Sequence, residues 1–363
     1  MKIAFYLGHP AHFHLFKNVI KSLSATHDTT ILIKKKDILE KLLEEAGLTY
    51  INILSEGRKD SKTGLLVGMI KRSWRLFRFY KKLKPDLLVG TSVENSFMTK
   101  ILGIPSINVN EDDAEVVPLY AKLSYPWASV ILNPSSCNSG KWDEKAIKYS
   151  GYQELAYLHP NHFTPQKKVV EKYFPVTDTY FIMRFAKLTA HHDKGIKGLN
   201  AELSKEIIKI LEPHGKVYIT SERELSPEFE PYRINIDTLD MHDVISFASL
   251  YIGDSQTMAA EAGVLGIPFI RFNDFVGRIG YLKELENTYQ LGFGYLPTQS
   301  DQLLNRITDL LNDDKLKHFN QNSRMLMLKD KIDLHLFLTW FIENYPQSVK
   351  IMKENPDYQN RFK

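Results

Sequence analysis

Cysteine is almost absent from this chain, and long apolar runs are missing altogether. The single cysteine, Cys137, excludes an intramolecular disulfide and favours a reducing compartment. No stretch of about 18 apolar residues occurs, so the sequence predicts no membrane-spanning helix. The apolar run at residues 1–7 is too short for a signal-peptide core and predicts a first β-strand instead. We therefore expect a cytoplasmic protein.

Repeats, low-complexity tracts and recognised nucleic-acid-binding modules are also missing, so nucleic acid is not an expected partner. The net charge of +4 is too small to identify a partner by itself. With 363 residues, 43% hydrophobic and 25% charged, the chain has the composition of a globular protein long enough for two domains.

Strand and helix patterns alternate along the chain in two series, separated by a proline-interrupted segment near residues 151–175. This alternation predicts right-handed crossovers, parallel sheets and an α/β fold. In the first series we expect strands at 2–7, 29–33, 50–54, 87–89, 107–109 and 130–132, and helices at 14–24, 37–46, 65–83 and 97–102. In the second series we expect strands at 179–184, 216–220, 234–236, 250–252 and 268–272, and helices at 199–211, 241–247 and 258–265.

A polar turn follows the buried strand at 250–252 and leads into a helix. Such a turn presents backbone N–H groups and the positive helix end at the carboxyl edge of a parallel sheet, where α/β proteins bind anions. The alternative is an ordinary helix N-cap by Asp254 or Ser255. The candidate binding residues are Gly253, Asp254, Ser255, Gln256, Thr257 and, one turn into the helix, Glu261.

Three histidines, His9, His12 and His14, lie in what we expect to be a loop after the first strand. Their spacing, with no acid nearby in sequence, is weak for zinc, and we predict no metal site. His12 titrates near neutrality and is a candidate general base or phosphate donor. The alternative is that the histidines only cap the loop and the following helix.

Arg184 ends the strand expected at 179–184, where a guanidinium can neutralise phosphate charge. A basic loop with His191 and His192 follows. The alternative for Arg184 is a surface salt bridge, and for the histidines a solvated loop. Nearby candidates for nucleotide contact are Ser221, Glu222 and His242.

Acidic residues follow two strands of the first series: Glu94 after 87–89, and Glu111 and Asp112 after 107–109. A carboxylate in such a place can deprotonate an acceptor hydroxyl. The alternative is a helix N-terminus enriched in acids.

The segment Asp254-Ser255, Glu261-Ala262 and Leu265-Gly266-Ile267-Pro268 resembles the UDP-binding segment of UDP-N-acetylglucosamine 2-epimerase. It is similar, more loosely, to MurG-type glycosyltransferases. The resemblance implies that Ser255, Gln256 and Thr257 contact a diphosphate and that Glu261 binds a ribose. The epimerase has two glycines where this chain has Gln256 and Thr257, so side-chain contacts can replace close backbone approach.

The chain further resembles an uncharacterised prokaryotic GT-B-like family over about residues 1–330. The motifs that carry the resemblance are His9–Asn18, Met183–Phe185, Ala190–Asp193 and Gly277–Leu282. It implies two Rossmann-like, doubly wound domains facing a cleft, with C-terminal helices crossing back. We accordingly expect an acceptor-binding and catalytic domain at 1–160, a nucleotide-sugar-binding domain at 161–335, and a helical tail at 336–363 packing on the first domain.

The resulting functional expectation is a metal-independent glycosyltransferase that uses a nucleotide-activated sugar, a UDP-sugar by resemblance, and builds a cell-surface polysaccharide or glycan. Its acceptor would be a glycan or a lipid-linked molecule, and no cofactor is expected. The alternatives are a sugar-nucleotide epimerase or hydrolase and a non-enzymatic sugar-nucleotide-binding protein.

The most basic stretch of the chain, Lys71–Lys84, interleaves bases with Trp74, Phe77 and Tyr80. One interpretation is a core-facing aromatic stripe with solvated bases. The other is peripheral contact with an anionic membrane, on the inner face of the cytoplasmic membrane.

Overall fold

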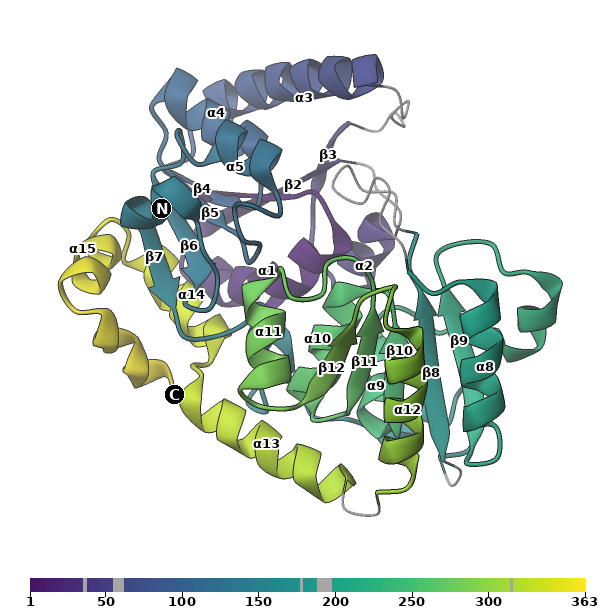
Figure 1. The fold of residues 1–363 in the computed structure, drawn as a ribbon. Coiled ribbons are helices and arrows are strands. Elements are labelled where there is room, and N and C mark those ends of the chain that lie inside the picture. Colours follow the sequence, from purple (N-terminus) through teal and green to yellow (C-terminus); the bar gives the residue numbers. More distant parts are fainter. Residues whose placement is uncertain (35–37, 55–61, 177–178, 188–197, 314–315) are drawn as a thin grey trace. The chain divides into compact units, whose positions relative to one another are not determined.

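The computed structural model describes the whole chain except residues 35–37, 55–61, 177–178, 188–197 and 314–315 (Figure 1). It divides into two compact units. Unit 1 comprises Met1–Tyr157 and Ile332–Lys363, and unit 2 comprises Leu158–Lys331.

Unit 1 is built on a seven-stranded parallel sheet whose strand order is β3-β2-β1-β4-β5-β6-β7. The order reverses direction between β1 and β4, and such a switch point is where open α/β sheets bind ligands. The strands are β1 (Lys2–Leu7), β2 (Asp28–Lys34), β3 (Ile51–Leu54), β4 (Leu87–Gly90), β5 (Ser106–Val109), β6 (Val130–Pro134) and β7 (Ala146–Tyr149).

Helices cover both faces of this sheet because its strands alternate apolar side chains to either side. Ala4 and Tyr6 pack with α3 and α4, whereas Phe5 packs against Phe16 of α1. The helices are α1 (Pro10–Ser24), α2 (Leu39–Glu45), α3 (Lys62–Leu83), α4 (Val93–Leu102), α5 (Pro118–Ser124), α6 (Leu155–Leu158), α14 (Leu334–Glu343) and α15 (Gln347–Glu354), with 3-10 turns at Gly140–Lys145 and Pro356–Phe362.

The C-terminal helices belong to unit 1. α14 packs on α1, and α15 packs on β7 (Figure 1). The chain end then folds over α14, where Asp333 N donates to the Phe362 carbonyl at 2.6 Å and the Trp340 and Tyr358 rings stack at 4.8 Å.

Unit 2 is built on a five-stranded parallel sheet of order β12-β11-β10-β8-β9. Its order reverses between β8 and β10, which gives it a switch point of its own. The strands are β8 (Tyr180–Phe185), β9 (Lys216–Ser221), β10 (Leu250–Gly253), β11 (Phe269–Phe272) and β12 (Gly292–Tyr295). The helices are α7 (Lys167–Val170), α8 (Ala201–Leu211), α9 (Met241–Phe247), α10 (Gln256–Leu265), α11 (Gly280–Asn287), α12 (Ser300–Leu311) and α13 (Leu316–Asp330), with a 3-10 turn at Pro227–Tyr232.

The expected class, α/β with two Rossmann-like doubly wound domains, is confirmed. Three local expectations were wrong. The helix expected at 14–24 begins at Pro10, because proline suits the first helical position and His9 caps it. The helix expected at 97–102 begins at Val93, capped by Ser92. Residues 234–236 form no strand; just before them, Arg233 forms a single parallel bridge with Ile219.

Candidate functional site

The switch point of unit 2 brings together two segments that lie far apart in the sequence. In the register of β10 and β8, Gly253 is paired with Arg184. A Cβ added at Gly253 would lie 2.6 Å from the Tyr251 hydroxyl and 3.0 Å from the Arg184 carbonyl oxygen. Only glycine permits this close approach, which sets Arg184 beside the turn that begins α10.

Ser255 caps α10, and its side chain accepts a hydrogen bond from Met258 N at 3.5 Å. Of the two N-cap candidates, Ser255 is therefore the one that caps the helix. In the part of the chain that the structure describes, the N–H groups of Gln256 and Thr257 have no hydrogen-bond acceptor. These groups form the positive end of a ten-residue helix at the switch point, which suits them to an anion.

The side chain of Gln256 is turned away to the neighbouring strand. Its Oε1 accepts a hydrogen bond from Arg271 Nη1 at 3.3 Å, and Arg271 is fully buried in β11 and ion-paired with Glu286. Gln256 thus supports the sheet edge, while its backbone N–H stays at the helix end. Sequence reasoning missed Arg271 and Glu286, although a charged residue inside the apolar strand Phe269–Phe272 was a usable signal.

Asp254 lies beneath the turn. Its buried carboxylate accepts a hydrogen bond from Ala186 N at 2.6 Å and pairs with Arg223 at 3.4 Å. Burial raises the pKa of Asp254 to about 6, against the lowering effects of the Ala186 N–H and Arg223. Asp254 therefore ties the segment after β8 to the end of β10.

Glu261 and His242 form a buried pair between α10 and α9. Glu261 Oε1 lies 3.0 Å from His242 Nε2, and both side chains are 6% exposed. The edge of Phe163 packs against the imidazole at a centroid distance of 6.1 Å. Two residues that the sequence placed separately around a nucleotide thus act as one hydrogen-bonded unit.

Arg184 is ion-paired with Glu222, which follows the neighbouring strand β9. The Arg184 side chain is 15% exposed and that of Glu222 is 51% exposed, so the carboxylate is the more solvated partner. Glu222 also accepts a hydrogen bond from Lys187 N at 3.2 Å, and Ser221 Oγ donates to the Arg223 carbonyl at 2.7 Å. His191 and His192 lie outside the described residues.

The switch point of unit 1 carries His12 and Glu94. Gly90 of β4 is paired with Tyr6 of β1, and an added Cβ there would lie 2.6 Å from the Tyr6 carbonyl oxygen. His12 Nδ1 accepts a hydrogen bond from Gly8 N at 3.1 Å, which fixes the ring against the end of β1.

The histidines of this region lie at the start of α1 rather than in a loop, which corrects the expectation. His9 is the N-cap and its Nδ1 accepts from Ala11 N at 3.2 Å. His14 is buried, with its ring 5.3 Å from that of Tyr157. The capping alternative therefore describes His9, and His14 is a packed core residue.

Glu94 is held in a buried ion pair. Its Oε1 lies 2.7 Å from Arg72 Nε of α3, and Ser92 Oγ donates to its Oε2 at 3.1 Å. Next to this pair, Tyr80 donates to Asn95 Oδ1 at 2.8 Å. The carboxylate thus fastens α3 to the first turn of α4.

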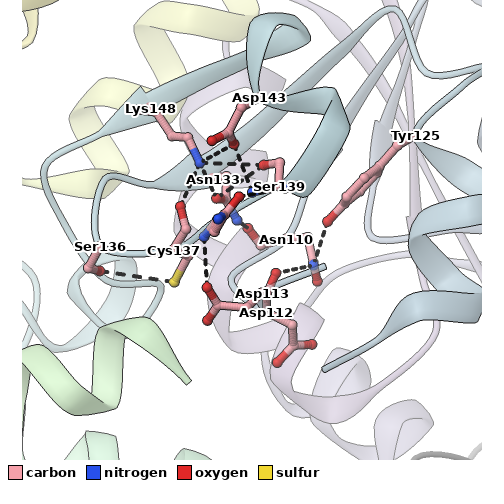
Figure 2. Close-up of polar contacts among 12 residues, drawn as sticks. Asn110, Asp112, Asp113, Tyr125, Asn133, Ser136, Cys137, Ser139, Asp143 and Lys148 are labelled. Atoms are coloured by element: carbon pink, nitrogen blue, oxygen red, sulfur yellow. Dashed lines mark hydrogen bonds and ion pairs between the residues drawn. The ribbon is translucent and has the colours of Figure 1, made fainter. Parts of the chain in front are cut away.

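The loop with Glu111 and Asp112 is fastened to the loop after β6 (Figure 2). Cys137 Sγ donates to the Glu111 carbonyl at 2.9 Å, and Asn138 N donates to Asp113 Oδ1 at 2.8 Å. Asn110 Nδ2 donates to the Asp112 carbonyl at 3.2 Å. The two acids stand in a tied loop, not at the N-terminus of a helix.

Lys148 of β7 is the centre of this network. Its Nζ lies 2.8 Å from Asn133 Oδ1, 2.6 Å from the Cys137 carbonyl and 2.9 Å from Asp143 Oδ1 (Figure 2). The ion pair with Lys148 lowers the pKa of Asp143, against the opposing effect of its partial burial. Sequence reasoning missed β7 and Lys148, because the lysine interrupts the apolar run of Ala146–Tyr149.

Two kinds of feature are absent from the described residues. No group of three or more His, Cys, Asp or Glu side chains there could hold a metal ion. No described helix is both long and apolar enough to cross a membrane.

A family model described as "Protein of unknown function (DUF354)" matches residues 1–288. Comparison with curated proteins finds no match. Among solved structures, an S. aureus MnaA–UDP co-structure is similar at a TM-score of 0.68 and 14% identity, covering 96% of this chain and 97% of that one.

Two further structures are similar in the same way. The UDP-GlcNAc 2-epimerase from Neisseria meningitidis bound to UDP-GlcNAc has a TM-score of 0.61 at 14% identity, covering 90% of this chain and 98% of that one. The spinosyn forosaminyltransferase SpnP has a TM-score of 0.63 at 14% identity, covering 94% of this chain and 98% of that one. At such identities the likeness establishes the fold alone.

Proposed function

The chain belongs to the DUF354 family, and we propose that this member is a metal-independent glycosyltransferase that uses a nucleotide-activated sugar. Unit 2 is proposed to hold the nucleotide, and UDP is the proposed nucleotide because similar structures are described with UDP or UDP-GlcNAc. The proposed acceptor is a glycan or a lipid-linked molecule of a cell-surface polysaccharide.

The observation that carries this proposal is the arrangement at the switch point of unit 2. Arg184 and the capped N-terminus of α10 meet there through the Gly253–Arg184 pairing. A guanidinium and two N–H groups beside one sheet edge suit a diphosphate, whose charge grows when it leaves the sugar. Stabilisation of that charge by fixed donors needs no metal.

The buried pair of Glu261 and His242 gives the proposed nucleotide site a second contact. A carboxylate oxygen accepts hydrogen bonds from the two hydroxyls of a ribose, and His242 Nε2 at 3.0 Å orients that carboxylate. For the acceptor, His12 is the proposed general base. Its Nδ1 accepts from Gly8 N, so the neutral ring carries its proton on Nε2, and Nδ1 is the atom that takes the hydroxyl proton when the acceptor replaces the Gly8 N–H.

The second candidate is a sugar-nucleotide epimerase, favoured by the acids Glu111 and Asp112 in the tied loop of unit 1. A reaction at the sugar ring needs carboxylates that are available to move protons. Glu94 is instead committed to Arg72 in a buried pair, and this favours transfer.

The decisive experiment exposes the purified protein to UDP-, GDP-, CMP- and dTDP-sugars and follows the melting temperature and nucleotide release. We expect a UDP-sugar to raise the melting temperature, with release of UDP only when an acceptor is added. Conversion to an isomeric sugar nucleotide without acceptor would establish the epimerase. Tight binding without consumption under either condition would indicate a binding protein, and no shift with any nucleotide would refute the proposal.

Glu261→Gln tests the nucleotide assignment. Loss of a charged acceptor for the ribose hydroxyls should weaken UDP binding about tenfold or more, because hydrogen bonds to charged groups contribute about 1.5–3 kcal/mol. The matched control is Glu202→Gln, an exposed change in the first turn of α8. Equal UDP affinity in Glu261→Gln and wild type would remove this role.

A further inference from the structure

The long helix α3 of unit 1 has two different faces. Arg72, Leu76 and Tyr80 follow one another at four-residue spacing and are all buried against the core of the unit. Arg72 is paired with Glu94, and Arg75 Nη1 donates to the Ile53 carbonyl at 2.9 Å. This face anchors the helix, and it uses two of the basic side chains to do so.

The opposite face is exposed and combines apolar with basic side chains. Ile70 and Trp74 are 59% and 60% exposed, and they are neighbours on the helix surface because they lie four residues apart. Arg78 and Lys82 continue the same row, which is turned about 200° from the buried row. We call this face the outer stripe; its members are Ile70, Lys71, Trp74, Arg78, Lys81 and Lys82, all exposed.

Two features make the outer stripe unlike an ordinary solvated helix face. The sequence from Lys62 to Pro85 contains no Asp or Glu, so its positive charge is not offset within the helix. Trp74 stacks on Phe77 at 5.7 Å, which holds the indole in an exposed position, and Lys81 Nζ lies 5.7 Å from the same Phe77 ring. A fixed apolar pair flanked by cations is the composition of helices that lie in a membrane interface.

We propose that the outer stripe docks unit 1 on an anionic lipid surface. Ile70 and Trp74 enter the boundary between headgroups and acyl chains, and Lys71, Arg78, Lys81 and Lys82 contact lipid phosphates. The helix lies in the plane of the surface, because its inner face is committed to the core of the unit. This proposal does not depend on the sugar-nucleotide reaction.

The exposed apolar residues Ile70 and Trp74 decide whether the outer stripe suits a membrane or a nucleic acid. Four cations alone suit either polyanion equally well. An exposed isoleucine next to the tryptophan gains nothing from phosphates, whereas it gains the free energy of leaving water when it enters a lipid interface. A lipid surface is therefore the occupant that uses every member of the outer stripe.

The test measures partition of the full chain onto vesicles. Phosphatidylcholine vesicles are compared with vesicles that also contain phosphatidylglycerol, at low and high salt, and Trp74 emission reports insertion. Of the four tryptophans, Trp74 is exposed, whereas Trp127, Trp142 and Trp340 are partly buried. We expect binding to the anionic vesicles only, a loss of binding with salt, and a blue shift of the emission.

Two variants with matched controls separate charge from insertion. Arg78→Gln with Lys82→Gln should weaken binding about thirtyfold, at about fivefold for each basic residue near an anionic surface. The control, Lys209→Gln with Lys283→Gln, removes two exposed lysines of unit 2 and should leave binding unchanged.

Trp74→Ser should also weaken binding, roughly tenfold by the apolar area it removes from the interface. Its control is Leu326→Ser, which removes an exposed apolar side chain of α13. Trp74→Phe should retain binding and lose the blue shift. Circular dichroism establishes that each variant is folded.

Three results would overturn the proposal. They are equal binding to neutral and anionic vesicles, anionic binding that neither outer-stripe variant weakens, and binding to single- or double-stranded DNA with none to vesicles.

Discussion

Asp254→Asn changes one buried acid at the switch point of unit 2 and makes stability depend less on pH. The pKa of Asp254 is raised from its ordinary value of 3.8 to about 6, chiefly by burial. A native state with the higher pKa binds the proton more tightly than the unfolded state does. The stability that this acid contributes is therefore fully present below about pH 4 and is lost as the pH rises through about 6.

The size of the effect follows from the same values. A change of pKa from 3.8 to about 6 corresponds to about 3 kcal/mol, at about 1.4 kcal/mol for each pKa unit. Asparagine keeps an oxygen that accepts from Ala186 N but cannot ionise. The stability of Asp254→Asn relative to wild type should therefore increase by about 2.5 kcal/mol between pH 4 and pH 7, where most of this difference is expressed.

Urea unfolding at several pH values measures this difference. All four tryptophans lie in unit 1, so far-UV circular dichroism follows both units while tryptophan fluorescence follows unit 1 as an internal reference. Asp309→Asn, an exposed change in α12, is the matched control. If the free energies of unfolding of wild type and Asp254→Asn vary in parallel from pH 4 to pH 7, the pKa of Asp254 is not raised in the folded protein.

Three other substitutions test individual contacts. Gly253→Ala should lower the free energy of unfolding by about 1–3 kcal/mol through overpacking, because its Cβ would lie 2.6 Å from the Tyr251 hydroxyl. It should also remove the UDP-induced rise in melting temperature. Wild-type stability of this variant would contradict the expectation. Arg72→Met should lower the free energy of unfolding by about 3–5 kcal/mol, because it leaves Glu94 buried without its cation. The double variant that also carries Glu94→Gln should regain much of this stability. Unfolding followed by tryptophan fluorescence measures both. His242→Phe should weaken UDP binding about tenfold without changing the fold, because the partner that orients Glu261 is gone. An unaltered UDP affinity in calorimetric titration would argue against this orienting role of His242.

The sequence predicted most strands within a residue or two, because each is a short apolar run between turn signals. It predicted the helix at 241–247 as the structure has it. It misplaced the starts of α1 and α4, where the caps His9 and Ser92 stand several residues before the first apolar periodicity. It missed β7 and β12, where a lysine and two glycines respectively interrupt short apolar runs.

The candidate residues were found by type and by their place after strands, but their partners were not. Glu94 and Arg72 lie 22 residues apart and meet only because α3 packs on α4. Glu261 and His242 meet because α9 packs on α10. Trp74, one expected member of a core-facing aromatic stripe, proved exposed, whereas Tyr80 is buried and Arg72 is a buried base.

By itself, the sequence determined the alternation of strands and helices, the polar turn from Gly253 to Thr257, and the basic composition of the helix that contains Trp74. These properties are local, because hydrophobic period, caps and turn residues act within a few positions of one another. Only the tertiary structure decided that Arg184 lies beside Gly253, that Gln256 faces Arg271, and that Glu94 is ion-paired with Arg72. The physical reason is that the order of strands in a sheet and the packing of helices on it are set by burial summed over each unit, which no short segment encodes.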